Sequence, residues 1–265
     1  MYCWGCGVKL YINGKIHDSK LFKKIFVQPA SGDAGIAYGT AIVSFIKNTK
    51  LKKNFESRNF YLGSKFNPNE IKKSLLKYRK KIHFTFEKDI AKKAAKLISD
   101  GNILGWFQGA AEFGPRALGN RSIISKPFPF SMKNYVNKNV KFREPFRPFA
   151  PAVLENFAKD YFYLTQESQH MLIATKVKNN KKKFIPATVH VDNSCRAQTV
   201  NRNINTKFFD LINNFYKITK IPVVLNTSFN VKGQPIVNDP DDAILCFLKY
   251  KIDYLAIGDF LLKKK

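Results

Sequence analysis

The chain has no run of about 18 apolar residues, the length that a membrane-spanning helix needs, so the sequence predicts no membrane span. Its first residues lack a basic start and a long apolar stretch, and we therefore expect no signal peptide and a cytoplasmic protein. Cysteine is scarce, and four residues (Cys3, Cys6, Cys195 and Cys246) fit a reducing compartment. Cys3 and Cys6 form a single C-x-x-C pair without a second pair or a suitably spaced histidine, which is a weak basis for a metal or redox site.

Acidic residues are also few, since 19 Asp and Glu against 46 Lys and Arg give a net charge of +27. A charge of this size makes a non-catalytic nucleic-acid-binding module one alternative. The lysines, however, are scattered or run in short groups that are typical of solvated surface, so this alternative is not favoured. Only eight basic residues are Arg, and the six between residues 116 and 202 are Arg116, Arg121, Arg143, Arg147, Arg196 and Arg202. Because Lys supplies the charge elsewhere, we infer that Arg is reserved for places where a rigid, bidentate donor matters.

The sequence has no G-x-x-x-x-G-K-[ST] loop, which excludes a P-loop as the holder of a phosphate. A different glycine-rich stretch, residues 108–122, lies between two apolar segments that predict buried strands. Three glycines and a proline fix its backbone. The side chains that we expect it to present are Glu112, Arg116, Asn120 and Arg121. An Arg fork on such a loop suits a carboxylate, phosphate or carbamate, and the alternative is a tight connection whose arginines pair with nearby acids.

Helices and strands interleave along the chain, which predicts an α/β class with a mixed, twisted sheet and flanking helices. The periodicity and the capping residues predict helices at 33–46, 68–78, 87–99, 131–139, 155–161, 204–219 and 239–250. Short apolar runs predict strands at 103–107, 122–125, 171–177, 187–191, 196–200, 222–225, 254–257 and 260–262. Three prolines exclude a regular helix from the arginine-rich loop at 140–151.

Five blocks of the chain are similar, in order and in composition, to the signature of the O-carbamoyltransferases that modify antibiotics and nodulation factors. The first reads Phe-Gly-Pro-Arg-Ala-Leu-Gly-Asn-Arg-Ser, and the blocks are residues 113–122, 140–151, 186–192, 196–200 and 225–230. The resemblance implies a C-terminal YrdC-like domain that makes carbamoyl-adenylate from carbamoyl phosphate and ATP (with Mg). It also implies an N-terminal domain of the actin-like ATPase fold, which transfers the carbamoyl group to a hydroxyl of a small-molecule acceptor. That transfer is helped by a divalent metal such as iron.

Six residues carry the predicted anion site, and they come from four separate loops or strand ends. The resemblance implies the first three as catalytic and all six as nucleotide and carbamoyl-phosphate contacts: Arg116, Lys141, Arg147, Arg196, Asn226 and Ser228. Four cations facing one cleft repel each other unless a multiply charged anion lies among them. The alternative is that they pair with acids such as Glu112, Glu144 and Asp192. His190, beside Asp192, is expected to be structural rather than a base.

The resemblance begins near residue 5, so roughly the N-terminal half of such an enzyme is not matched. We expect three parts: a remnant of the actin-like transfer domain (1–65), a linker (66–86) and the YrdC-like domain (87–265). A separate polypeptide is expected to supply the other half, and the chain alone to activate carbamoyl phosphate at most. The resemblance implies Asp33 as a metal ligand only if another chain supplies the missing H-x-x-x-H histidines; otherwise Asp33 caps a helix. A YrdC-like enzyme of RNA modification is a further alternative.

Overall fold

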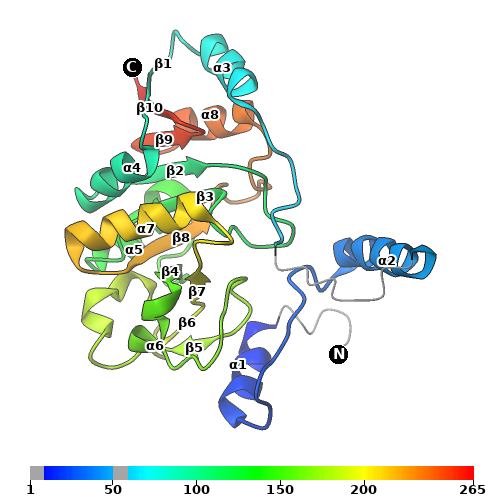
Figure 1. The fold of residues 1–265 in the computed structure, drawn as a ribbon. Helices are drawn as coiled ribbons and strands as arrows, with labels where there is room; N and C mark the ends of the chain where they lie inside the picture. The colour runs from blue at the N-terminus through cyan, green and yellow to red at the C-terminus, as the bar shows by residue number, and fades with distance from the viewer. Residues whose placement is uncertain (1–8, 50–58) are drawn as a thin grey trace.

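The computed structural model describes residues 9–49 and 59–265, and a mixed eight-stranded sheet forms its centre (Figure 1). The strands follow the order β1-β10-β9-β2-β3-β8-β4-β7. Pairs β2–β9 and β4–β7 are parallel and the others antiparallel, which confirms the predicted mixed sheet. The strands are β1 (Ile82–Phe86), β2 (Leu104–Phe107), β3 (Arg121–Ser125), β4 (Ala150–Leu154), β7 (Gln198–Val200), β8 (Val223–Ser228), β9 (Tyr254–Ile257) and β10 (Phe260–Lys264), with β5 (Thr175–Lys176) and β6 (Ser194–Cys195) paired separately.

Two layers of helices cover the sheet. On one face α4 (Ile90–Ser99) and α7 (Thr206–Thr219) lie side by side (Figure 1), and Phe208 and Phe215 pack there with Ile124. The other face is covered by α3 (Pro68–Lys77), α5 (Ser131–Val136) and α8 (Pro240–Lys249), where Phe247 packs with Ile123. Neighbouring strand residues point to opposite faces, so Ile123 and Ile124 of β3 supply both cores.

The shorter helical segments connect these layers. They are the π-turn η1 (Asn137–Lys141), α6 (Ala158–Tyr161) and the 3-10 turns η2 (Glu155–Phe157), η3 (Lys182–Phe184) and η4 (Pro186–Thr188). Helix starts follow the predicted signals, since the Asp239 side chain accepts a hydrogen bond from the N–H of Asp242 and Pro240 is the first helical residue. The prediction that Asp33 caps its helix is wrong, because Gly32 is the N-cap and no side chain caps that end.

Two predicted strands are wrong or much shorter. Residues 187–191 form no strand, because Pro186 starts the 3-10 turn η4 and a tight turn follows at once. In that turn the N–H of Asn193 donates to the carbonyl of His190, and Asn193 adopts a left-handed φ of 64°. The predicted strand 171–177 shrinks to β5, since Met171 has a φ of 56° that breaks extended backbone.

The N-terminal helices α1 (Leu10–Ser19) and α2 (Asp33–Asn48) project from one side of the sheet (Figure 1). Helix α1 is held against the body, because the Asn13 side chain donates to the carbonyl of Leu172 at 2.8 Å. The domain division stays a prediction, to which the structure adds that the interval 66–86 contains α3 and strand β1, which pairs with β10. The Cys3–Cys6 pair lies outside the described residues.

Candidate anion-binding site

The loop between β2 and β3 is held by one carboxylate. Glu112 Oε1 accepts hydrogen bonds from the backbone N–H groups of Leu118, Asn120 and Arg121 at 2.7, 2.7 and 3.1 Å. Gly119 sits where a Cβ would lie 2.2 Å from the Phe208 ring, and its φ is 103°, so only glycine fits. Glu112 is thus used by the loop itself, and no arginine of the described residues forms a salt bridge with it.

Arg121 is not presented to a ligand, so the prediction that placed it among the presented side chains is wrong. It is fully buried, and its guanidinium donates to the carbonyls of Gln108 and Ser64 at 2.8 and 2.9 Å. The guanidinium also stacks on the Phe107 ring, 3.6 Å from its centroid. Arg121 therefore holds the loop in place from the protein interior. Asn120 is also buried, and its side chain donates to the carbonyl of Ala110.

Lys141 contacts Ser228, another of the predicted site residues. Its Nζ lies 3.2 Å from Ser228 Oγ and 2.9 Å from the Ser228 carbonyl. It also lies 2.7 Å from both the carbonyl and Oδ1 of Asn230, and Ser228 Oγ donates to Asn230 Oδ1 at 2.6 Å. Burial first, then the charge of Arg143, lower the pKa of Lys141 to about 7. The four oxygens around Nζ act in the opposite direction and favour the charged ammonium form, because only that form has three N–H groups to donate to them.

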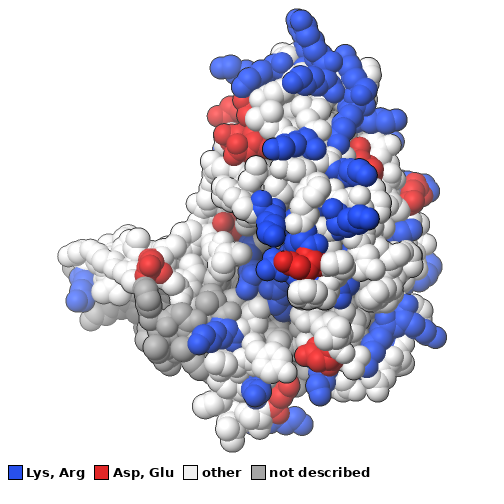
Figure 2. Space-filling model, turned by 180° about the vertical axis from the view of Figure 1, so that it is seen from behind, with Lys and Arg blue, Asp and Glu red and all other residues white. Residues whose placement is uncertain are grey.

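Arg116 and Arg196 have no acid partner among the described residues. Their Nε atoms are buried and make no hydrogen bond. Burial lowers the pKa of both guanidinium groups, that of Arg196 to about 10, with the charges of Arg116 and Arg143 as the next causes. The charges of Arg116 and Arg143 act on Arg196, and the charge of Arg143 acts on Lys141, so these cations lie within Coulombic reach of one another in one region. Figure 2 shows Lys and Arg side chains grouped in a hollow near the middle of the back face.

Arg143 is part of this region, although the sequence analysis did not assign it to the site. Burial, then the charge of Arg147, lower its pKa to about 10. Its Nε donates to Asn137 Oδ1 at 2.7 Å, and its guanidinium lies 4.7 Å from the centroid of the Phe149 ring. Asn230 is the second residue missed. The signal was present for both, because Arg143 lies two residues after Lys141 and Asn230 two residues after Ser228.

The remaining predicted residues differ in character. Arg147 is half exposed and pairs with Glu144 (Nε to Oε2, 3.2 Å), so for this residue the alternative of an acid partner is right. Asn226 is buried, and its Nδ2 donates to Gln198 Oε1 at 2.9 Å and to the carbonyl of Ala117 at 3.2 Å. Its Oδ1 has no partner among the described residues.

His190 borders the cation region. Burial first, then the charge of Arg196, lower its pKa to about 4, so the ring is neutral at neutral pH. Its Nε2 is buried without a hydrogen bond, and Ser194 Oγ lies 3.4 Å from its Nδ1. Asp192, the expected neighbour, accepts hydrogen bonds from Ser194 instead of an arginine.

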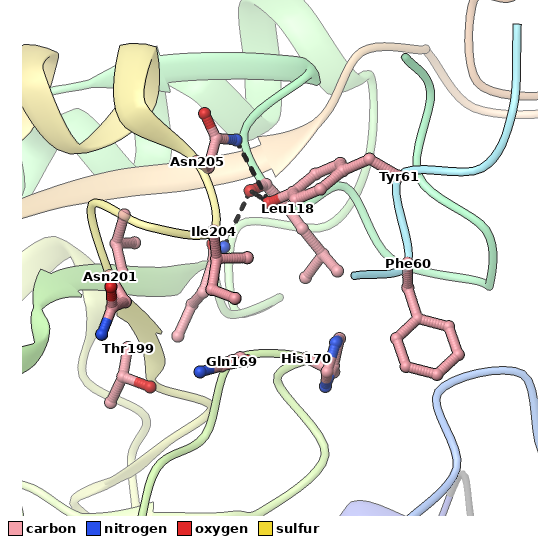
Figure 3. A pocket seen from close by; sticks show the side chains of 11 residues that line it. Phe60, Tyr61, Leu118, Gln169, His170, Thr199, Asn201, Ile204 and Asn205 are labelled. Atoms are coloured by element: carbon pink, nitrogen blue, oxygen red, sulfur yellow. Dashed lines mark hydrogen bonds between the residues drawn. The ribbon is translucent and has the colours of Figure 1, made fainter. Parts of the chain in front are cut away.

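A separate recess lies where the N-terminal segment meets the loop (Figure 3). It is small, is partly open to solvent, and is lined by Tyr61, His170, Asn205 and eight other residues. The Tyr61 hydroxyl donates to the carbonyl of Leu118 at 2.9 Å and accepts from Asn205. None of the six predicted site residues lines this recess, so it is distinct from the cation region.

Asp33 is exposed at the first residue of α2. Within residues 9–49 and 59–265, no three His, Cys, Asp or Glu side chains lie together as a metal-binding group. One exposed carboxylate does not make a metal site, so a metal at Asp33 needs ligands from outside the described residues. Among the described helices none has both the length and the apolar character to span a membrane.

The structure is thus that of an α/β protein with a group of cations, of which Arg116 and Arg196 have no acid partner among the described residues. Comparison with known families matches residues 95–264 to the Carbamoyltransferase C-terminus and residues 2–42 to the Carbamoyltransferase N-terminus. The chain belongs to the carbamoyltransferase family.

Two curated relatives are nodulation proteins. The chain is 41% identical to nodulation protein NolNO of Sinorhizobium fredii, over 96% of this chain and 38% of that protein. It is 40% identical to NolO of Bradyrhizobium diazoefficiens, over 96% of this chain and 47% of that protein. The chain therefore spans half or less of the length of these relatives.

Solved structures of HypF are more distant. HypF of T. kodakarensis has a TM-score of 0.47 at 17% identity, over 70% of this chain and 22% of that one. Full-length HypF in a phosphate- and nucleotide-bound form has a TM-score of 0.43 at 15% identity, over 69% of this chain and 22% of that one.

Proposed function

We propose that this chain activates carbamoyl phosphate with ATP to form carbamoyl-adenylate, for transfer to a hydroxyl of a small-molecule acceptor. The observation that carries the proposal is the pair Arg116 and Arg196. Both guanidinium groups are partly buried and lack an acid partner among the described residues, and the charge of Arg116 helps to lower the pKa of Arg196. Unpaired cations at such proximity are costly in the empty protein, and a polyphosphate removes that cost.

The proposed chemistry requires no side-chain nucleophile. Hydrolysis of carbamoyl phosphate gives carbamate and phosphate. A carbamate oxygen then attacks the α-phosphorus of ATP, forming a carbon–oxygen–phosphorus link, while the bond between the α-phosphorus and the bridging oxygen breaks and pyrophosphate leaves. ATP enters such a step as its Mg complex, and catalysis depends on positioning and on charge neutralisation.

Each site residue has a role in this scheme. Arg116 and Arg196 neutralise the phosphate oxygens, and Arg143 and Arg147 extend the positive region. Lys141 is held at the end of β8 by Ser228 and Asn230, with Nζ to Oγ and Oδ1 distances of 3.2 and 2.7 Å. The unpartnered Oδ1 of Asn226 is suited to accept a hydrogen bond from the carbamoyl amide.

The whole transfer reaction needs more than this chain. The N-terminal family model matches residues 2–42, and NolNO and NolO are more than twice the length of the matched region. We therefore propose that the acceptor hydroxyl and the metal are bound mainly by a further N-terminal portion, with Asp33 as one ligand. On this proposal, the chain alone does not carbamoylate an acceptor.

Pyrophosphate release from ATP, measured with and without carbamoyl phosphate, tests the proposal. We expect release that depends on carbamoyl phosphate and falls at least about 100-fold in Arg116→Met, the loss typical for one transition-state donor. Arg202→Met is the matched control, because Arg202 is exposed and pairs with Asp210 at 3.5 Å. No dependence on carbamoyl phosphate, combined with tight and salt-sensitive RNA binding, would instead support the nucleic-acid alternative.

A further inference from the structure

The imidazole of His190 is held in one tautomer by its neighbours. Its Nδ1 lies 3.4 Å from Ser194 Oγ, and that hydroxyl donates its only hydrogen to Asp192 Oδ1 at 2.6 Å. Ser194 Oγ can therefore only accept from the ring, which places the hydrogen of the neutral imidazole on Nδ1. Nε2 is left as an acceptor with a free lone pair. It is buried, and no described residue donates a hydrogen bond to it.

Lys133 of α5 lies near this acceptor and is also unpartnered. The residue is only 3% exposed, and no hydrogen bond or ion pair joins its ammonium to another described residue; its Nζ lies 5.7 Å from the centroid of the Phe130 ring. The N–H of Ala187 donates to the carbonyl of Pro127, and η4 packs against α5, so the segment that leads to His190 lies along this helix. An ammonium that is buried without a counter-charge is costly unless a ligand meets it.

A buried donor and a buried acceptor close together suit one particular kind of ligand group. A carbamoyl group carries a carbonyl oxygen, which accepts, and an amino group, which donates, on the same carbon. Ionised phosphate and carboxylate oxygens only accept, so they meet the cations of the site but have no hydrogen for Nε2 of His190. In a region rich in donors, an acceptor therefore distinguishes a ligand that has an N–H group from one that has none.

We propose that Lys133 and His190 recognise the carbamoyl group of the substrate. The Lys133 ammonium donates to its carbonyl oxygen, and His190 Nε2 accepts from its amino group, whose second N–H is free for the unpartnered Oδ1 of Asn226. His190 is then a specificity-determining residue and not a base, and the identity of the ligand rests on the proposed function. Nε2 is recessed from solvent, so it meets the ligand when neighbouring side chains shift, which the flexible stem of Lys133 permits.

Acetyl phosphate tests the assignment, because it has a methyl group in place of the amino group. Calorimetric titration of the full chain gives a Kd for each acyl phosphate, and we expect the wild type to bind carbamoyl phosphate at least about tenfold more tightly. His190→Phe removes the acceptor from a ring that is neutral at neutral pH, and it should lower this preference at least about fivefold. His83→Phe, at an exposed position of β1, is the matched control and should keep the preference.

Two further variants separate recognition from a structural role. His190→Gln keeps an acceptor near the position of Nε2, whereas His190→Asn keeps a donor near the position of Nδ1 and its contact with Ser194. Recognition of the amino group predicts that the preference stays within about twofold in His190→Gln and is lost in His190→Asn. The reverse order would overturn the proposal, because it would show that the contact with Ser194 is what matters.

Lys133→Met should weaken the binding of carbamoyl phosphate and acetyl phosphate alike, by at least about fivefold, since both carry the carbonyl oxygen. Lys138→Met, at an exposed position of η1, is its control and should change neither Kd. Pyrophosphate has no carbonyl or amino group, so its Kd should stay within about threefold of the wild type in every variant, which also shows that the variants fold.

Equal affinities of the wild type for the two acyl phosphates, or a preference that His190→Phe leaves unchanged, would overturn the proposal. Pyrophosphate release from ATP separates it from the proposed function. A protein that prefers carbamoyl phosphate through His190 but releases no pyrophosphate keeps the recognition and rejects the activation chemistry. Carbamoyl-phosphate-dependent release without any contribution of His190 to the preference does the opposite.

Discussion

Replacing Arg196 by Met should have opposite effects on the empty and the liganded protein. Burial and the charges of Arg116 and Arg143 lower the pKa of Arg196 from 12.5 to about 10. At about 1.4 kcal/mol per pKa unit, this lowering disfavours the charged form in the folded protein by at most about 3.5 kcal/mol. Because Arg196 is only partly buried, solvent screening reduces this to about 1–2 kcal/mol.

Arg196→Met keeps an apolar stem and removes the charge, so the empty protein should gain about 1–2 kcal/mol in its free energy of unfolding. For a chain of this size that corresponds to a Tm increase of about 2–6 °C. Pyrophosphate at about 100 times its Kd should add about 2.7 kcal/mol to the wild type and much less to the variant. Thermal unfolding with and without pyrophosphate measures both effects.

The control is Arg202→Met, whose unfolding free energy should stay within about 0.5 kcal/mol of the wild type, with or without pyrophosphate. A variant at Arg196 that is less stable when empty, yet fully stabilised by pyrophosphate, would refute the reasoning. That result would mean that Arg196 is a structural residue whose charge is satisfied in the empty protein.

Three further outcomes follow from the site. Arg147→Ala should lower carbamoyl-phosphate-dependent pyrophosphate release by less than Arg116→Met does, because Arg147 is half exposed and paired with Glu144, whereas Lys183→Ala, at an exposed position, should not lower it; equal losses at Arg147 and Lys183 would exclude a specific role for Arg147. The pKa of Lys141 is lowered to about 7, and a bound anion favours the ammonium form of its side chain. Calorimetric titration should therefore show that the affinity for pyrophosphate falls by up to about tenfold per pH unit from pH 7 to about 9. An affinity that does not change with pH would place Lys141 outside the site. The empty protein should gain stability over the same range, since the unfolded chain binds that proton more tightly. Glu112→Ala leaves three loop N–H groups without their acceptor and should cost about 2–4 kcal/mol in urea unfolding, and an unchanged midpoint would disprove its role in the loop.

Much of the fold follows from local sequence signals. The alternation of apolar segments predicts β2, β3, β9 and β10 within one or two residues, and Asp239 followed by Pro240 marks the start of α8. Residues 187–191 show the limit of such signals. Val189 and Val191 have the spacing of a strand, but Pro186 and the turn at Asn193 leave too little extended backbone, and Val191 is 93% exposed.

The sequence selects candidate site residues but not the contacts that each of them makes. Residue types and the family resemblance select Arg116, Lys141 and Arg196, but they cannot show which acids are already used. Glu112 accepts hydrogen bonds from three backbone N–H groups, and Glu144 pairs with Arg147. These two acids therefore leave Arg116 and Arg196 without a carboxylate partner among the described residues. These contacts depend on tertiary structure, since β3, β4 and β8 bring distant segments together.

Arg121 illustrates the same limit. Arg121 follows Asn120 at the end of a glycine-rich loop, and this sequence context is typical of an arginine whose side chain faces a ligand. Only the pleat of β3 turns its side chain inward, onto the Phe107 ring and toward the carbonyls of Gln108 and Ser64. The difference between a ligand-binding and a loop-holding arginine is therefore decided by strand register, which composition does not encode.

The central claim is that Arg116, Lys141 and Arg196 bind one multiply charged anion. A crystal structure of the protein with pyrophosphate tests this most directly. We expect pyrophosphate oxygens within hydrogen-bond distance of the Arg116 and Arg196 guanidinium groups and of Lys141 Nζ. Pyrophosphate bound elsewhere, with these three side chains contacting no common ligand, would contradict it.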